Sequence, residues 1–212
     1  MIKALIFDLD NTLIDRQRAF REMLDRKFHS LFTDENLIQQ MIQDVMEWDA
    51  NGTVERIVVF KKWVDKYHVT CITAEKLDAD WSKESGTVAF LFDDVRDTLS
   101  ALKSKYKLAL LTNGNASSQR RKINTIQIDD LIDYSLVSSE FGVKKPDKSI
   151  FEYTCHQIGY KCEECAYIGD NYNIDVLGSR NAGMLPIYVS RNHEEHEDVQ
   201  TIHEIKELLK LF

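Results

Sequence analysis

The chain has 212 residues, 43% of them hydrophobic, and its formal net charge is −8. This length can bury a full core with room for a modest insertion, whereas the negative charge disfavours general electrostatic binding of a nucleic acid polymer. No hydrophobic run approaches the ~20 residues that cross a bilayer, so we expect no membrane partner. Four cysteines without a secretory signal favour a reducing compartment, and we expect a cytoplasmic protein.

The first predicted element is a short strand at residues 2–7, which ends in Asp8 and Asp10. A strand points residues 8 and 10 to the same side, and a nearly all-hydrophobic strand suits the centre of a parallel sheet. Two adjacent carboxylates repel each other unless a cation neutralises them, and Mg²⁺ prefers such oxygen ligands. Taken alone, the pair is also compatible with ordinary loop or helix-capping acids.

Residues 16–88 carry helical rather than strand periodicity. Hydrophobic residues that share a stripe indicate three helices, and a fourth, weaker helix is predicted at residues 74–85. Helices joined by short loops form a bundle, so this segment is predicted to be a bundle inserted after the first strand. The stripes are Phe20, Leu24, Phe28 and Leu31, then Leu37, Met41 and Val45, then Phe60, Val64 and Tyr67.

After residue 88, predicted strands alternate with predicted helices. Such alternation favours right-handed crossovers, so we expect an α/β fold: a Rossmann-like, doubly wound parallel sheet with an inserted α-helical bundle. A final amphipathic helix is predicted to bear Ile202, Ile205, Leu208 and Leu209. The other strands are expected at 107–111, 134–137 and 165–168, and the helices at 94–105, 116–126, 147–158 and 174–182.

Polar residues follow each of these strands. Ligands of open parallel sheets bind outside the carboxyl ends of the strands. A hydroxyl, an ammonium and further carboxylates are therefore expected to converge on Asp8 and Asp10. The groups are Thr112-Asn113-Gly114 after the second strand, Lys144-Lys145-Pro146 after the third, and Asp170 with Asp175 after the fourth.

In this order and spacing, the four groups resemble the motifs of the haloacid dehalogenase superfamily of phosphohydrolases. The resemblance covers the chain on both sides of the helical insertion. It implies a core at residues 1–15 and 89–212 and a helical cap at 16–88 that closes over a metal site. The matching motifs are Asp8-Leu9-Asp10-Asn11-Thr12, then Thr112, then Lys145 before Pro146, and the segment from Gly169 to Asp175.

The resemblance also implies roles for the carboxylates. Asp8 is expected to be a metal ligand and the nucleophile that forms an aspartyl phosphate. Asp10 is expected to protonate the leaving oxygen and to bind Mg²⁺ through its main-chain carbonyl, and Asp170 to bind Mg²⁺ directly. Asp175 is expected to reach the metal through water or to hold Lys145; a favourable acid near a helix N-terminus is the alternative.

The substrate phosphate is expected to contact Thr112, Lys145 and the main-chain N–H groups of Asn113 and Gly114, because orphan donors at a helix start favour anions. The alternative for Thr112 is a simple strand-end cap. The neighbouring Lys144 is expected to be solvated.

Specificity is expected to lie in the cap, because cap closure orients the substrate. Trp48 and Arg56 are the candidate contacts; the alternatives are that Trp48 packs between cap helices and that Arg56 is solvated. The predicted activity is Mg²⁺-dependent hydrolysis of small phosphomonoesters, such as nucleotides, sugar phosphates or organic-acid phosphates. A sugar phosphomutase and a non-catalytic regulatory homologue stay open as alternatives, and so does the oligomeric state.

Overall fold

The computed structural model describes residues 1–212, and the chain divides into two compact units. The core unit consists of Met1–Asp15 and Leu91–Phe212, and the helical unit of Arg16–Phe90. The sequence predicts 16–88 for the insertion, so the boundary in the structure falls two residues later. Each unit has a hydrophobic core of its own.

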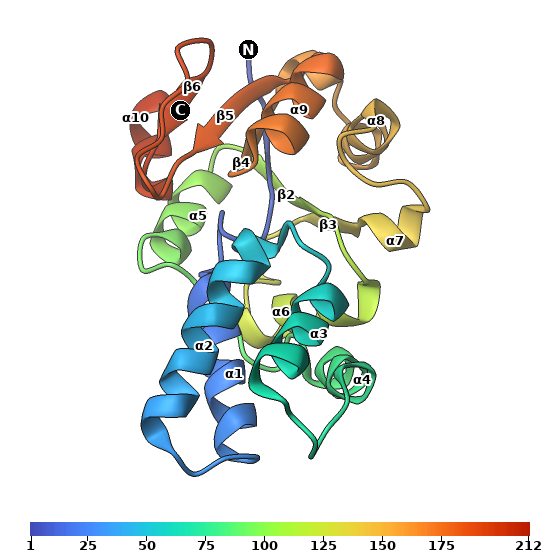
Figure 1. Ribbon diagram of the computed structural model, residues 1–212. Coiled ribbons are helices and arrows are strands. Elements are labelled where there is room, and N and C mark those ends of the chain that lie inside the picture. Colours follow the sequence, from blue (N-terminus) through green and yellow to red (C-terminus); the bar gives the residue numbers. More distant parts are fainter. The chain divides into compact units, whose positions relative to one another are not determined.

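The core unit contains one six-stranded sheet in the order β3-β2-β1-β4-β5-β6, and every neighbouring pair is parallel (Figure 1). The predicted parallel α/β fold is therefore confirmed. The order places β1 and β4 in the middle, as their buried sequences require. The strands are β1 (Ala4–Phe7), β2 (Lys107–Thr112), β3 (Tyr134–Val137), β4 (Cys165–Gly169), β5 (Leu185–Val189) and β6 (Gln200–Ile202).

The register aligns the carboxyl ends of the three central strands. Phe7, the last residue of β1, pairs with Leu110 of β2 on one side and Ile168 of β4 on the other. Asp8 thus leaves the sheet beside the ends of β2 and β4. This is the edge at which open parallel sheets bind ligands.

Helices connect the strands of the core unit. Three of the four helices predicted here, at 94–105, 116–126 and 147–158, agree with the structure to within two residues, whereas the segment predicted as a helix at 174–182 begins as a π-helix. The helices are α5 (Val95–Lys103), α6 (Ala116–Ile126), α7 (Ser138–Phe141), α8 (Lys148–Gln157), η2 (Cys162–Glu164), η3 (Tyr172–Val176), α9 (Leu177–Asn181), η4 (Ile205–Glu207) and α10 (Leu208–Leu211).

The last part of the chain differs from the prediction. Ile202 ends β6 and pairs with Val189 of β5, so it does not belong to a final helix. The helix that follows is short and starts as a 3-10 turn at Ile205. Neither β5 nor β6 was predicted. Pairing with an existing sheet edge outweighs the local helical pattern here.

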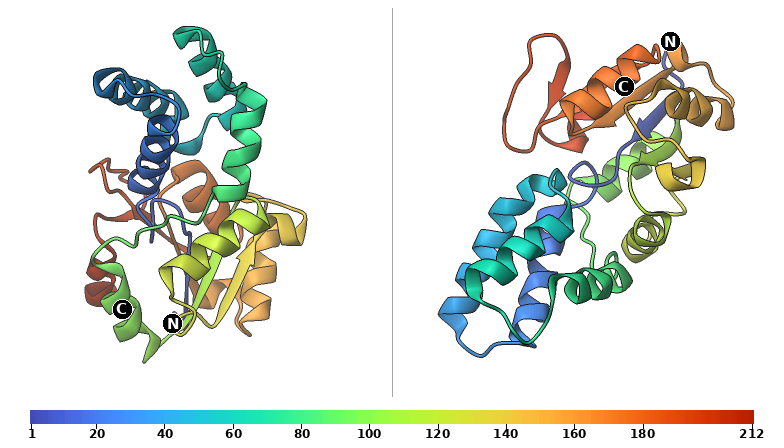
Figure 2. Two further views of the ribbon diagram at one scale, coloured as in Figure 1. Left: turned by 90° about the horizontal axis from the view of Figure 1, so that it is seen from below. Right: turned by 45° about the vertical axis from the view of Figure 1, so that its right-hand side comes forward.

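The helical unit is a four-helix arrangement in which α1 packs on α2, α2 on α3, and α3 on α4; the right-hand view of Figure 2 shows the four together. Its core includes Phe28 and Trp63, whose rings stack 4.7 Å apart. Leu31 lies just beyond the end of α1, where it packs partly buried against this core. The elements are α1 (Arg16–His29), α2 (Glu35–Asp49), η1 (Ala50–Gly52), α3 (Arg56–Tyr67) and α4 (Ala74–Glu84).

Two helices of this unit start after residues whose side chains cap them. The side chain of Asp34 accepts a hydrogen bond from Leu37 N, and that of Thr73 accepts one from Lys76 N. Each satisfies an N–H group that has no partner within its helix. No helix in either unit combines the length and hydrophobicity that a membrane span requires.

Candidate active site

Three carboxylates gather at the carboxyl edge of the sheet. Asp8 follows β1, Asp170 follows β4, and Asp175 lies in η3; each offers an oxygen within 4.8 Å of the others. Asp8 and Asp175 are buried and Asp170 is half-buried. Thr12, which is fully buried, lies with its hydroxyl 3.4 Å from Asp170 Oδ1. An all-oxygen donor set of this kind suits a hard divalent cation such as Mg²⁺.

The electrostatics of the cluster also fit a cation. Burial raises the pKa of Asp8 to about 7; Lys145 opposes this shift, while the Asp175 carboxylate adds to it. Burial likewise raises the pKa of Asp170 well above its ordinary value, with Asp8 and Asp175 contributing. These directions mean that the protein leaves negative charge in the cluster incompletely neutralised. A divalent cation would remove this cost.

Lys145 provides the positive charge of the site. Its Nζ lies 2.7 Å from Asp8 Oδ1, from Asp175 Oδ1 and from the Tyr167 hydroxyl, and its side chain is 2% exposed. Burial lowers the pKa of this ammonium, but Asp175 and Asp8 outweigh burial and raise the pKa above its ordinary value. Lys144, by contrast, is exposed.

The loop that carries Lys145 is fixed by Asn113. The side chain of Asn113 accepts a hydrogen bond from Lys145 N and donates one to Lys145 O. The N–H of Gly114, expected to contact phosphate, donates instead to Ser138 Oγ. The helix starts at Ala116, as predicted, and Asn115 caps it. The expected contact of the Gly114 N–H with phosphate stays a prediction, and in the structure this N–H has Ser138 Oγ as its partner.

Asp175 is held close to the end of β4. Its Oδ2 accepts a hydrogen bond from Asn171 N. A Cβ added to Gly169 would lie 2.5 Å from Asp175 Cγ, so only glycine allows this approach. Asp175 thus contacts Lys145 and is also one of the three clustered carboxylates. Its position is compatible with both expected roles, holding Lys145 and reaching the metal.

The carboxylate of Asp10 is held by two side chains of α6. Lys122 Nζ lies 2.7 Å from both of its carboxylate oxygens, and Gln119 Nε2 donates to Oδ2 at 2.9 Å. Gln119 Nε2 also donates to Thr112 Oγ1 at 2.8 Å. Thr112 is buried, with 1% of its surface exposed.

Sequence reasoning missed three residues that hold the site: Tyr167, Gln119 and Lys122. Tyr167 lies inside β4, where its hydroxyl donates to Leu111 O and accepts from Lys145. Gln119 and Lys122 are three residues apart on the helix that follows the Thr112 strand. Polar residues three apart share one helix face. This pattern, on the helix after the Thr112 strand, is the signal by which Gln119 and Lys122 could have been predicted as site residues.

The two specificity candidates lie in the helical unit and have partners there. Arg56 donates from Nε to Asp78 Oδ1 at 2.6 Å and from Nη2 to Ser82 Oγ. Lys62 Nζ lies 4.2 Å from the centroid of the Trp48 ring, which is partly buried. Arg56 is therefore ion-paired rather than simply solvated.

The loop between these two candidates has an unusual backbone. Ala50, Asn51 and Gly52 all have positive φ angles, of 44°, 58° and 84°. Asp49, just before them, forms a two-pronged ion pair with Arg16. Positive φ angles at residues other than glycine, here Ala50 and Asn51, are common at ligand-binding sites. In this loop the ion pair between Asp49 and Arg16 also holds the adjoining backbone.

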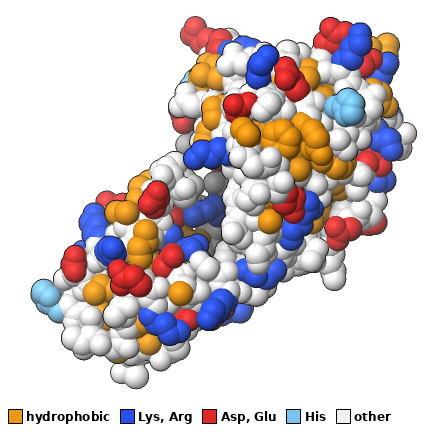
Figure 3. All heavy atoms as spheres, turned by 90° about the vertical axis from the view of Figure 1, so that its right-hand side faces the viewer, with side chains coloured by type: hydrophobic (Ala, Val, Ile, Leu, Met, Phe, Trp, Pro, Cys, Tyr) orange, Lys and Arg blue, Asp and Glu red, His pale blue; other side chains and the backbone are white.

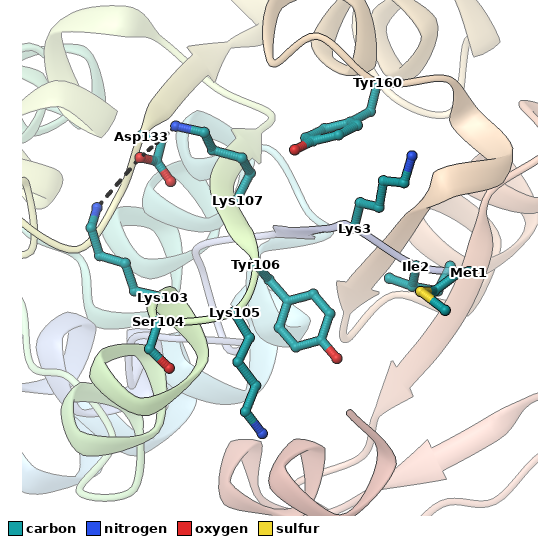
Figure 4. Close-up of a pocket in the computed structure, with 10 residues that line it drawn as sticks. All are labelled: Met1, Ile2, Lys3, Lys103, Ser104, Lys105, Tyr106, Lys107, Asp133 and Tyr160. Carbon is teal, nitrogen blue, oxygen red and sulfur yellow. Dashed lines mark hydrogen bonds and ion pairs between the residues drawn. The ribbon is translucent and has the colours of Figure 1, made fainter.

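A pocket of about 520 Å³ lies at the opposite edge of the sheet, near the amino ends of β1 and β2 (Figure 4). Its lysines are largely paired: Lys103 and Lys107 flank Asp133, and Lys3 bonds Glu164. It contains none of the predicted site residues. We therefore place the candidate active site at the carboxyl edge.

Surface charge gives no sign of a polymer-binding face in the view of Figure 3. Lys and Arg side chains are interspersed there with Asp and Glu in both units. A continuous basic surface, which nucleic acid polymers require, is not seen on that face.

Comparison with known proteins identifies the family. A family model for haloacid dehalogenase-like hydrolases matches residues 2–183. The chain therefore belongs to this hydrolase family, and the predicted resemblance is confirmed; it is an enzyme of the hydrolase class.

Curated relatives with similar sequences are phosphatases. A glyceraldehyde 3-phosphate phosphatase from Methanopyrus kandleri is 27% identical, over 94% of this chain and 88% of its own length. An N-acylneuraminate-9-phosphatase from Mus musculus is 30% identical, over 86% of this chain and 80% of its own length.

Solved structures share the fold. The putative HAD-hydrolase YfnB from Bacillus subtilis, bound to magnesium, superposes with a TM-score of 0.79 at 21% identity and covers 99% of this chain and 98% of its own. A 2-haloacid dehalogenase from Pseudomonas syringae gives a TM-score of 0.68 at 20% identity, over 100% of this chain and 98% of its own. At these identities the likeness concerns the fold alone.

Proposed function

We propose that this protein is a Mg²⁺-dependent phosphatase of small phosphomonoesters that works through an aspartyl phosphate on Asp8. The observation that carries the proposal is the buried contact of Lys145 with Asp8 and Asp175, beside Asp170. It provides a nucleophile, a cation and further metal-binding oxygens at the ligand-binding edge of the sheet. Relatives named as phosphatases support the reaction class.

In the first step a carboxylate oxygen of Asp8 attacks phosphorus and the bond from phosphorus to the ester oxygen breaks. Lys145 donates to Oδ1 of Asp8, which leaves Oδ2 without a hydrogen bond from the protein. Thr112 donates its hydroxyl hydrogen to a phosphate oxygen, and Asp10 gives a proton to the leaving oxygen. Acid catalysis of this type typically contributes ~10²–10⁴-fold.

In the second step water attacks phosphorus, Asp10 takes a proton from that water, and the bond from phosphorus to Asp8 breaks. Inorganic phosphate leaves, Asp8 is again a free carboxylate, and Asp10 again carries the proton that it donates in the first step. Asp8, Asp170 and the main-chain carbonyl of Asp10 are the groups that would hold Mg²⁺, which supplies positive charge beside the phosphate oxygens when bound. Asp175 keeps Lys145 in place through its contact with Nζ.

We further propose that the helical unit acts as a cap that sets specificity through Trp48 and Arg56. The setting we propose is cytoplasmic, where a reducing medium would keep the four cysteines as thiols. A sugar phosphomutase would use the same residues, so it stays the alternative. No observation in the structure favours it over hydrolysis.

The test is phosphate release from a panel of phosphomonoesters with and without Mg²⁺. The panel includes glyceraldehyde 3-phosphate, N-acylneuraminate 9-phosphate, nucleoside monophosphates and hexose phosphates, and each product is also checked for an isomer of the substrate. Asp8→Asn should reduce release to background while the protein stays folded. Substantial turnover by folded Asp8→Asn would refute the covalent mechanism, and an isomer without free phosphate would favour the mutase.

A further inference from the structure

The buried side-chain amide of Gln119 donates hydrogen bonds to both Asp10 and Thr112. Gln119 is 3% exposed, and its Nε2 donates to Asp10 Oδ2 at 2.9 Å and to Thr112 Oγ1 at 2.8 Å. Asp10 is the proposed acid and base, and Thr112 the proposed phosphate contact. Lys122, on the same face of α6, lies with its Nζ 2.7 Å from both carboxylate oxygens of Asp10.

The direction of these hydrogen bonds is fixed by chemistry. The Asp10 carboxylate accepts hydrogen bonds, so the Gln119 atom that faces it must be the amide nitrogen, which only donates. The same nitrogen therefore donates its other hydrogen to Thr112 Oγ1. Since Thr112 accepts from Gln119, its own hydroxyl hydrogen is left for another acceptor, which in the structure is Asn113 O at a long 3.4 Å. A phosphate oxygen, which only accepts, needs a donor of this kind.

The backbone leaves room for this arrangement. Gly114 has a φ of +138°, and a Cβ there would lie 3.1 Å from Gln119 Cγ. Asn115 starts α6 by accepting a hydrogen bond from Ser117 N, and this start places Gln119 and Lys122 on the face toward Asp10. Gln119 is therefore built into the site by the turn that follows Thr112.

We propose that Gln119 is a positioning residue that couples acid catalysis to phosphate binding. Together with Lys122 it fixes the orientation of the Asp10 carboxylate, and it makes the Thr112 hydroxyl a donor toward the substrate phosphate. This inference rests on the proposed phosphatase function and deepens it. It predicts that loss of the amide affects esters differently according to how much their leaving group needs a proton.

Two esters separate the effects. An alkyl phosphate has a leaving oxygen that needs a proton from Asp10, whereas p-nitrophenolate leaves without one. Gln119→Leu should lower kcat/KM for an alkyl phosphate by about 10–100-fold, the range expected when a hydrogen bond to a charged group is lost. The loss for p-nitrophenyl phosphate should be clearly smaller. Gln119→Glu should lose more than Gln119→Leu, because its carboxylate faces that of Asp10.

The matched control for Gln119→Glu is Asn124→Asp, which makes the same change from amide to carboxylate at an exposed position of α6, and Asn124→Leu is the control for Gln119→Leu. Each control should leave both rates near those of the unchanged protein. In an Asp10→Asn background, Gln119→Leu should cause little further loss with the alkyl ester, since residues that act as a unit are not additive.

The outcomes are distinct. A larger loss for the alkyl ester, absent in the controls and in the Asp10→Asn background, supports the positioning role. Equal losses for the two esters, or rates equal to those of the controls, overturn it while hydrolysis by the unchanged protein stands. If the unchanged protein releases no phosphate from either ester, the proposed function fails, and this inference fails with it.

Discussion

Lys145→Met should strongly destabilise the metal-free protein. Lys145 Nζ is 2.7 Å from oxygens of Asp8, Asp175 and Tyr167, and 2% of its side chain is exposed. Met keeps most of the side-chain volume but removes the charge, so the carboxylates stay buried without their cation. Breaking a buried ion pair in this way typically costs about 3–5 kcal/mol.

The assay is urea unfolding in the presence of a chelator, with Lys144→Met as the matched control. Lys144 is exposed, so its replacement should change the free energy of unfolding by no more than about 0.5 kcal/mol. Added Mg²⁺ should restore part of the stability of Lys145→Met, because a ligand that binds the folded state stabilises it.

A double variant tests the cause. Asp175→Asn in the Lys145→Met protein removes one of the uncompensated carboxylates. The double variant should therefore lose much less free energy of unfolding than the sum of the losses of the two single variants. A loss below about 1 kcal/mol for Lys145→Met would refute the reasoning, since a buried pair of this geometry cannot be so weak if its carboxylates remain charged. Strict additivity in the double variant would do the same.

Three further predictions concern the metal, pH and the cap. Asp170→Ala should raise the Mg²⁺ concentration needed for half-maximal activity, because an oxygen ligand is lost; an unchanged metal dependence would exclude Asp170 as a ligand. Burial raises the pKa of Asp8 to about 7, so the folded metal-free protein holds this proton more tightly than the unfolded chain does. The raised pKa of Asp8 therefore stabilises the fold fully below about pH 4, and this stabilisation is lost as the pH rises through 7. With chelator present, the free energy of unfolding of Asp8→Asn should fall less with rising pH than that of the unchanged protein, and an equal fall would contradict this prediction. Changes at Trp48 or Arg56 should alter the ranking of substrates by kcat/KM but affect p-nitrophenyl phosphate much less, because a generic ester cannot use remote binding energy; uniform loss over the panel would assign them to the fold.

Sequence analysis was sufficient to find the first four strands in order and the edge of the sheet at which the site is expected. Hydrophobic runs that end in Asp8, Thr112 and Asp170 predict strands whose carboxyl ends meet, and helical periodicity marks the insertion. These signals are local: a strand or helix pattern and the polar residue at its end are read from a few neighbouring positions.

Packing between distant elements sets the partners of each group in the site. Gln119 and Lys122 contact Asp10 across 109 and 112 positions, and Tyr167 contacts Lys145 across 22, and no local pattern specifies such pairs. The same holds for β6, whose three residues are a strand only because β5 offers a free edge. Gly114 N–H was predicted to face phosphate, yet Ser138 lies within reach and accepts its hydrogen bond. A side chain's chemistry is set by its residue type, but its hydrogen-bond partners are set by packing between elements distant in the chain.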